Sequence, residues 1–115
     1  MRAFIPIVLA ALLASCGGSE STAVVPPVVK APSTASVNMV SRLFTPASVD
    51  VSAGAVITFT NSDGFNHNVT FANATVGTIP NYTTGAKTIT MPTTLGTYAY
   101  SCTLHNGMTG SITVK

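Results

Sequence analysis

Residues 96–114 read GTYAYSCTLHNGMTGSITV, and this stretch decides how the rest of the chain is interpreted. Two segments rich in Thr, Tyr, Ile and Val, residues 97–102 and 110–114, flank a short loop that contains an Asn-Gly pair. β-Branched and aromatic residues favour strands, and Asn and Gly both tolerate the positive φ angles of a sharp turn. The stretch therefore predicts two strands joined by a tight loop that carries Cys102, His105 and Met108.

The same composition continues through most of the chain after about residue 37. Val, Ile, Thr and aromatic residues dominate, turn residues recur about every eight to twelve positions, and no window has a helical period. We therefore expect an all-β sandwich of about seven strands, with the polar stretch Ala72–Thr84 as a loop. The candidate strands are Val37–Val40, Ser48–Val51, Val56–Asn61, His67–Phe71, Ala86–Met91, Thr97–Cys102 and Gly110–Val114.

The alternation of side chains along these strands predicts where two polar residues point. In the segment HNVTF, His67 is in phase with the apolar Val and Phe, whereas Asn68 is expected to face outward. In the segment TYAYSC, Cys102 is in phase with both tyrosines. Each of the two side chains therefore points inward at a strand end, but strand phase alone does not show that they meet.

These residue types together indicate a copper site. The loop places Cys102, His105 and Met108 within seven residues, and His67 is the only other histidine of the sequence. One thiolate, two imidazoles and one thioether are the ligands of blue-copper electron-transfer sites, in which soft sulfur suits Cu(I) and imidazole binds Cu(II). Singly, each residue has a plainer explanation, as a buried hydrophobe, a core-filling thioether or a solvated loop histidine. The combination is what favours copper.

On these residues the chain resembles the cupredoxin family of type 1 blue copper proteins, which includes plastocyanin, amicyanin and pseudoazurin. The resemblance covers GTYAYSCTLHNGMTGSITV and also LFTPASVDVSAGAVITFTNSDGFNHNVTF, residues 43–71. It implies a cupredoxin-like Greek-key sandwich that holds one copper ion, Cu(I) or Cu(II). It also implies that His67, Cys102 and His105 are strong equatorial ligands and that Met108 is a weak axial ligand.

The resemblance assigns residues around the ligands as well. Asn68 matches a position of the family whose side-chain amide links the two segments that carry the ligands. The link lies near the residue that follows the cysteine, which is Thr103 in this chain. The exposed edge of His105 would be the electron port, within a ring of residues that dock redox partners. Our candidates for this ring are Phe65, Leu104, Asn106 and Gly107. Family loops often carry proline where this chain has Leu104 and Asn106, so we expect a less rigid hold on His105.

The N-terminal residues predict export and a lipid anchor. Residues 1–15, MRAFIPIVLAALLAS, contain an early Arg and an apolar run too short to span a bilayer, as in a signal peptide. Cys16 follows in a sequence that resembles a bacterial lipobox, so we expect cleavage before Cys16 and its lipidation. An ordinary secretory signal is the alternative. The lipidated chain would be anchored to a membrane of the bacterial cell envelope without spanning it, facing the periplasm or the cell surface.

Residues 16–36 predict a flexible tether in front of a single domain. They are rich in Ser, Thr, Ala, Pro and Gly, and their prolines favour an extended chain. An edge strand at VVPPVV is the alternative, although proline removes donors from a strand ladder. Residues 37–115 would then form one small copper-binding domain. Lipidation of Cys16 would leave Cys102 without a disulfide partner, so that its thiolate is available to a metal.

The charge of the chain and its small number of histidines exclude several classes of function. The formal net charge is +2 without a basic stripe, so nucleic acid is not expected as a partner. We expect a monomer that is not an enzyme and that shuttles single electrons between redox proteins. A copper carrier, chaperone or sensor with the same ligands is the main alternative. A copper oxidase or nitrite reductase would need further histidines, and a metal-free surface module would need no such ligand set.

Overall fold

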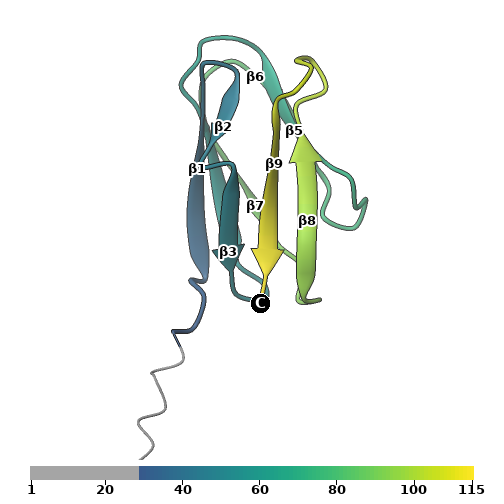
Figure 1. Ribbon diagram of the computed structural model, residues 1–115. Helices are drawn as coiled ribbons and strands as arrows, with labels where there is room; N and C mark the ends of the chain where they lie inside the picture. Colours follow the sequence, from purple (N-terminus) through teal and green to yellow (C-terminus); the bar gives the residue numbers. More distant parts are fainter. Residues whose placement is uncertain (1–28) are drawn as a thin grey trace, which may run out of the picture.

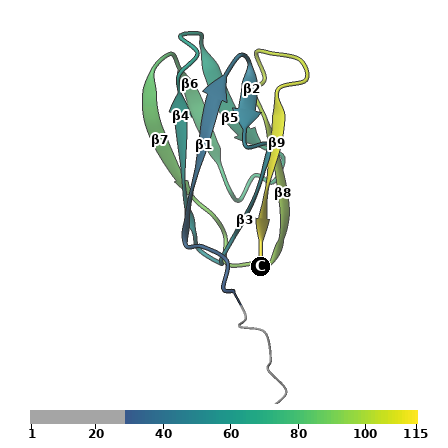
Figure 2. The same cartoon turned by 60° about the vertical axis from the view of Figure 1, so that its left-hand side comes forward.

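The computed structural model describes residues 29–115, which form a sandwich of two β-sheets (Figures 1 and 2). One sheet has the strand order β2–β1–β4–β7 and the other has the order β3–β9–β8–β5–β6. The strands are Thr34–Val40 (β1), Leu43–Thr45 (β2), Ser48–Val51 (β3), Val56–Asn61 (β4), His67–Phe71 (β5), Thr78–Tyr82 (β6), Gly85–Thr90 (β7), Gly96–Ser101 (β8) and Thr109–Val114 (β9). Residues 29–115 contain no helix, and hence none that could cross a membrane.

The five-stranded sheet brings distant parts of the chain to one end of the sandwich. β8 pairs with β9 from Gly96 to Ser101, and the ligand loop starts at the next residue, Cys102. β5 pairs with the other edge of β8 and runs antiparallel to it. The start of β5 and the end of β8 therefore lie at the same end of the sheet, which places His67 beside Cys102.

The core lies between the two sheets and continues up to this end. The inward rows of the strands are buried as alternation predicts, for example Ile57 and Phe59 of β4, both 0% exposed. The Tyr100 ring packs against three phenylalanine rings at centroid distances of 4.7, 5.1 and 5.3 Å. Such aromatic pairs contribute about 0.5–1.5 kcal/mol each beyond their buried area. They hold Tyr100 in place two residues before Cys102 on the same strand.

Two of the nine strands were not predicted from the sequence. β2 has three residues and follows a turn at Ser41 and Arg42, whose φ angles of 53° and 57° are uncommon for residues other than glycine. β6 lies inside Ala72–Thr84, so the prediction of a loop there is wrong. Pro80 and polar neighbours hide the strand pattern, but β6 is an edge strand, and edges tolerate proline.

The domain also begins earlier than the sequence predicts. The carbonyl oxygens of Pro32 and Ser33 accept backbone hydrogen bonds from the domain, and β1 begins at Thr34. Residues 34–36 therefore belong to the sandwich and not to the tether. The predicted signal peptide, Cys16 and most of the predicted tether lie outside the described residues. The described chain enters β1 at the end opposite to the β8–β9 loop (Figure 1).

Because two tyrosines are buried, we expect the free energy of unfolding to fall at alkaline pH. Burial raises the pKa of Tyr82 to about 12, and it raises the pKa of Tyr100 as well. In the unfolded chain both phenols ionise near pH 10. Above this pH the unfolded state therefore binds fewer protons than the folded state. The tyrosine contribution to the free energy of unfolding is complete below about pH 10 and is lost as the pH rises through about 12.

Phenylalanine variants test this prediction, because the two hydroxyl groups differ in their partners. The Tyr100 hydroxyl is buried and has no hydrogen-bond partner within residues 29–115, whereas the Tyr82 hydroxyl donates to the Phe59 carbonyl oxygen at 2.9 Å. At neutral pH we expect Tyr100→Phe to raise the free energy of unfolding by about 1 kcal/mol and Tyr82→Phe to lower it by a similar amount. Denaturant titrations up to about pH 12 should show a shallower alkaline loss in both variants. An alkaline loss as steep as in the wild type would contradict the prediction.

Candidate metal centre

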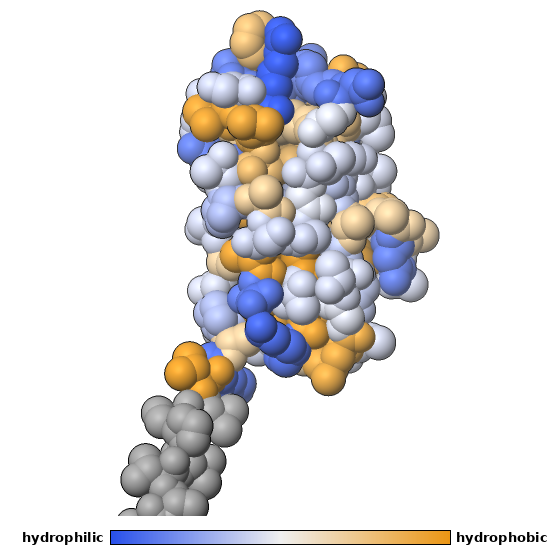
Figure 3. Space-filling view, in the orientation of Figure 1, coloured by the Kyte–Doolittle hydropathy of each residue, from blue (hydrophilic) through white to orange (hydrophobic). Residues whose placement is uncertain are grey.

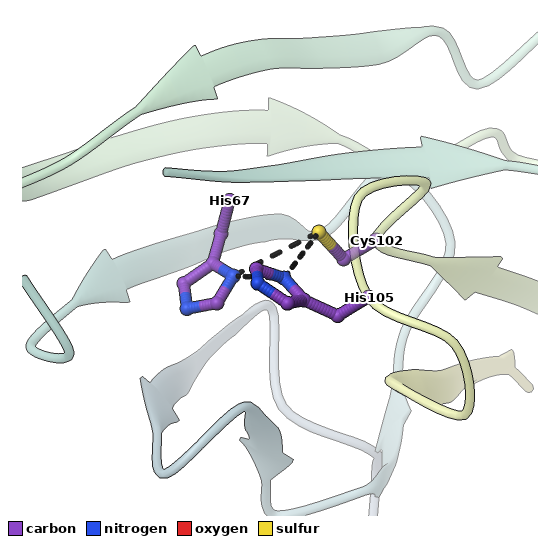
Figure 4. Close-up of side chains that lie close together, drawn as sticks. All are labelled: His67, Cys102 and His105. Carbon is purple, nitrogen blue, oxygen red and sulfur yellow. Dashed lines mark hydrogen bonds between the residues drawn. The ribbon is translucent and has the colours of Figure 1, made fainter. Parts of the chain in front are cut away.

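Three of the four predicted ligands meet at one end of the sandwich. His67 opens β5, Cys102 directly follows β8, and His105 lies on the loop between β8 and β9 (Figure 4). The Sγ atom of Cys102 is 3.8 Å from Nδ1 of His67 and 3.6 Å from Nδ1 of His105. The two Nδ1 atoms are 3.1 Å apart. Strand alternation alone did not show whether the side chains of His67 and Cys102 meet, and the structure shows that they do.

The triangle of these three atoms fits a metal ion. With metal–nitrogen bonds of about 2.0 Å and metal–sulfur bonds of about 2.3 Å, the values found for zinc, ligand atoms in a trigonal plane are about 3.5–3.8 Å apart. The observed separations of 3.1, 3.6 and 3.8 Å are close to these values. His67 and Cys102 are buried and His105 is partly exposed, so the site lies just below the surface. The residues present therefore fit a bound copper ion.

Met108, the fourth predicted ligand, is held on the same loop. Its carbonyl oxygen accepts a hydrogen bond from the Cys102 N–H at 2.9 Å, and its own N–H donates to the His105 carbonyl at 3.3 Å. Gly107 has a φ of +81°, which lets the loop turn back between the two ligands. Met108 is 1% exposed and lines a hollow of about 380 Å³ together with Cys102 and His105. The loop thus holds the residue that carries the thioether close to the two residues that carry the thiolate and the imidazole.

Asn68 links the two segments that carry the ligands. Its side-chain oxygen accepts a hydrogen bond from the Thr103 N–H at 3.1 Å, and its amide donates to the Thr103 hydroxyl at 2.8 Å. The amide also donates to Asn81 of β6 at 2.9 Å. This is the pair of residues that the resemblance singles out. Asn68 shares a face of β5 with Thr70, whose hydroxyl donates to its side-chain oxygen at 3.0 Å, as the alternation predicts. It is nevertheless only 6% exposed, because Thr103 and Asn81 cover it.

Asp63 is a site residue that was not predicted from the sequence. Its Oδ2 atom lies 2.9 Å from Nε2 of His67 and accepts the Arg42 N–H at 2.8 Å, while Oδ1 accepts the Ser41 N–H at 3.1 Å. The hydrogen bond with His67, and after it the bond from the Arg42 N–H, lowers the pKa of Asp63 below its ordinary value. A signal was available, because the chain has only three acidic residues and one of them stands four positions before His67.

Asn61 shapes the loop that carries Asp63. Its amide donates to the carbonyl oxygens of Phe65 and Tyr82 at 2.8 and 2.7 Å, and its side-chain oxygen accepts the Asp63 N–H at 3.0 Å. Asn61 is 4% exposed, so water competes little for these bonds. They connect the loop to β6 and place Asp63 against His67.

The residues predicted to dock a partner all lie on the surface near this end. They are Phe65, Leu104, Asn106 and Gly107. Val40 and Leu43, on either side of the turn between β1 and β2, are also exposed apolar residues, and the Arg42 guanidinium lies 5.3 Å from the centre of the Phe65 ring. Figure 3 shows apolar surface near the upper end of the domain, which is the end of the β8–β9 loop in Figure 1. The metal centre is therefore bordered by exposed apolar side chains.

The sequence of the chain matches a known protein family. Residues 32–115 match the copper binding proteins of the plastocyanin/azurin family. The chain belongs to this family and is a cupredoxin. The cupredoxin is 40% identical over 86 residues to plastocyanin A/B of Petroselinum crispum and 36% identical over 85 residues to plastocyanin of Scenedesmus fuscus. These alignments cover 64% of this chain and 88% and 87% of the two relatives.

Solved structures share the fold of this cupredoxin. A reduced Cu(I) form of an amicyanin variant superposes with a TM-score of 0.64 at 26% identity, covering 71% of this chain and 82% of the other. An oxidised amicyanin variant has the same TM-score and identity, with coverages of 74% and 85%. The predicted fold class and the predicted copper cofactor are confirmed. The family and the candidate ligands support a blue copper electron-transfer protein.

Proposed function

We propose that this cupredoxin shuttles single electrons between redox proteins of the bacterial cell envelope. The observation that carries the proposal is the convergence of His67, Cys102 and His105 within 4.8 Å, with Met108 on the same loop. When bound, copper supplies a one-electron change between Cu(II) and Cu(I), and the mixed ligand set suits both states.

The protein's own contribution is to hold these ligands in a single arrangement. Asn68 ties the two ligand segments together, and the aromatic cluster around Tyr100 fixes the strand that leads to Cys102. A preorganised site needs little rearrangement when its charge changes. We propose that electrons enter and leave through the partly exposed ring of His105, the ligand that lies nearest to the surface.

The surface around His105 suits short-lived contacts with other proteins. We propose that the apolar side chains of Phe65 and Leu104, together with Asn106 and Gly107, dock the redox partners. Short-lived redox encounters bury small interfaces, below about 1,200 Å² in total, so a few exposed side chains are enough to form one. The chain has only three acidic and five basic residues, so we expect weak electrostatic steering of the encounter.

We propose that the domain is a monomer tethered to a membrane through lipidated Cys16. About twenty tether residues at about 3.1 Å each would reach at most roughly 60 Å. The described chain enters at the end opposite to the metal centre, so a tether there would leave the copper end free to meet partners (Figure 1). We also propose that the protein is not an enzyme, because both of its histidines belong to one site and leave no imidazole for a second, catalytic copper.

Redox cycling of the copper-loaded protein tests the electron-shuttle proposal. We expect an intensely blue protein that ascorbate bleaches and ferricyanide restores over repeated cycles, with one copper ion per chain retained throughout. Absorption spectra and metal analysis after each cycle measure both quantities. Release of copper on reduction would contradict the proposal and favour the copper carrier or sensor, since a carrier has to give up its ion.

A further inference from the structure

Asp63 contacts the side of His67 that faces away from the other ligands. Nδ1 of His67 points toward Cys102 and His105, whereas Nε2 lies 2.9 Å from Oδ2 of Asp63. The His67 side chain is 0% exposed and that of Asp63 is 11% exposed. Water therefore has little access to this hydrogen bond and screens the carboxylate charge weakly.

Hydrogen bonds to both the carboxylate and the backbone N–H hold Asp63 in place. The turn between β1 and β2 points two successive N–H groups, those of Ser41 and Arg42, at its two oxygens. Both turn residues have positive φ angles, and such turns create small concave sites for anions. From the other side, Asn61 accepts the Asp63 N–H. The carboxylate is thus a fixed negative charge one imidazole ring away from the metal centre.

We propose that Asp63 is a positioning residue that fixes the tautomer of His67 and lowers the reduction potential of the bound copper. The inference rests on the copper-binding function proposed above. An ionised carboxylate only accepts hydrogen bonds, so Nε2 keeps its proton and Nδ1 keeps its lone pair for the metal. A nearby negative charge stabilises Cu(II) more than Cu(I), because the oxidised ion carries the larger positive charge.

The reduction potential of Asp63→Asn tests the role of the charge. Asp50→Asn is a matched control, because it removes the same charge from an exposed carboxylate that pairs with Lys115 at the C-terminus, the end opposite to the ligand loop (Figure 1). We expect voltammetry of Asp63→Asn to show at least a tenfold shift in favour of Cu(I), a rise of about 59 mV for a one-electron couple. We expect less than a third of this rise in Asp50→Asn.

A rise of the same size in both variants, or no rise in Asp63→Asn, would overturn the inference. The same experiment separates this failure from a failure of the proposed function. If the wild-type protein forms no blue copper complex, the proposed function fails. If the wild type is blue and Asp63→Asn has an unchanged potential, only the role of Asp63 fails.

Nitrogen NMR of the metal-free protein tests the tautomer independently of copper. We expect the proton of neutral His67 on Nε2 in the wild type and in Asp63→Asn, whose amide oxygen also accepts a hydrogen bond. In Asp63→Ala we expect a mixture of tautomers and copper affinity reduced by about 10- to 100-fold. A wild-type proton on Nδ1 would overturn the positioning role, and this measurement decides the question even if the variants fail to fold.

Discussion

Cys102→Ser is expected to abolish the strong visible absorption of the copper-loaded protein while leaving the domain folded. The absorption of a blue copper site depends on the bond between copper and a thiolate, and a serine hydroxyl is neither soft nor ionised at neutral pH. Serine is close to cysteine in size, and the Cys102 side chain is 3% exposed, so we expect little change in packing. The loss of colour should therefore be complete and the loss of stability small.

Absorption spectra after addition of one equivalent of Cu(II) measure this effect, and thermal unfolding of the metal-free protein measures the stability. Ser101→Ala is a suitable control, because Ser101 precedes the ligand but lies out of phase with it on β8. We expect this control to stay blue. A strong visible band in Cys102→Ser would exclude Cys102 as a ligand, and with it the blue copper site described above.

Gly110→Ala is expected to be the most destabilising of the stability variants considered. Gly110 lies opposite Tyr100 in the β8–β9 pair, and a β-carbon there would overlap the Cζ and Oη atoms of the Tyr100 ring. The ring has little room to move, because Phe44, Phe59 and Phe71 pack around it. Overpacking costs about 1–3 kcal/mol, and we expect a cost near the upper end of this range because the β-carbon would overlap several atoms of the ring. This cost exceeds the 0.5–1 kcal/mol or so that alanine normally gains over glycine in a strand.

Denaturant titration of the metal-free protein measures this cost, and a net loss of about 2 kcal/mol would lower the melting temperature by roughly 10 °C. The control is the same substitution in a Tyr100→Leu background, where the ring that causes the overlap is gone. There we expect Gly110→Ala to be neutral or slightly stabilising. An equal cost in both backgrounds would show that the ring is not responsible.

The ligand loop and most of the strands could be predicted because they depend on near neighbours in the sequence. Period-two alternation marked His67 and Cys102 as inward-facing, and their exposures of 0% and 3% agree. β2 and β6 were not predicted. β2 has only three residues, and β6 contains Pro80 and polar residues that hide the strand pattern. An edge strand takes part of its stability from its pairing partner, which its own residues do not reveal.

Asp63 and Asn61 escaped prediction for a related reason. A loop with Asn, Asp and Gly is normally interpreted as a solvated turn, because these residues are common there. Their roles here depend on partners in other elements: Asn61 reaches Tyr82 on β6, and Asp63 reaches the turn at Ser41 and Arg42. Only the packed sheets bring these groups together.

The amino-acid sequence by itself determined the β-strand period and the tight loop from Cys102 to Met108, because each is a property of residues close together in the chain. It also named the four candidate ligands, because their residue types are scarce in this sequence. The tertiary structure decided that His67 meets a sulfur atom 35 residues away and that the carboxylate behind its ring is held by two backbone N–H groups. The physical reason is packing. The pairing of β5 with β8 and the burial of the apolar rows leave one arrangement in which these distant groups come into contact.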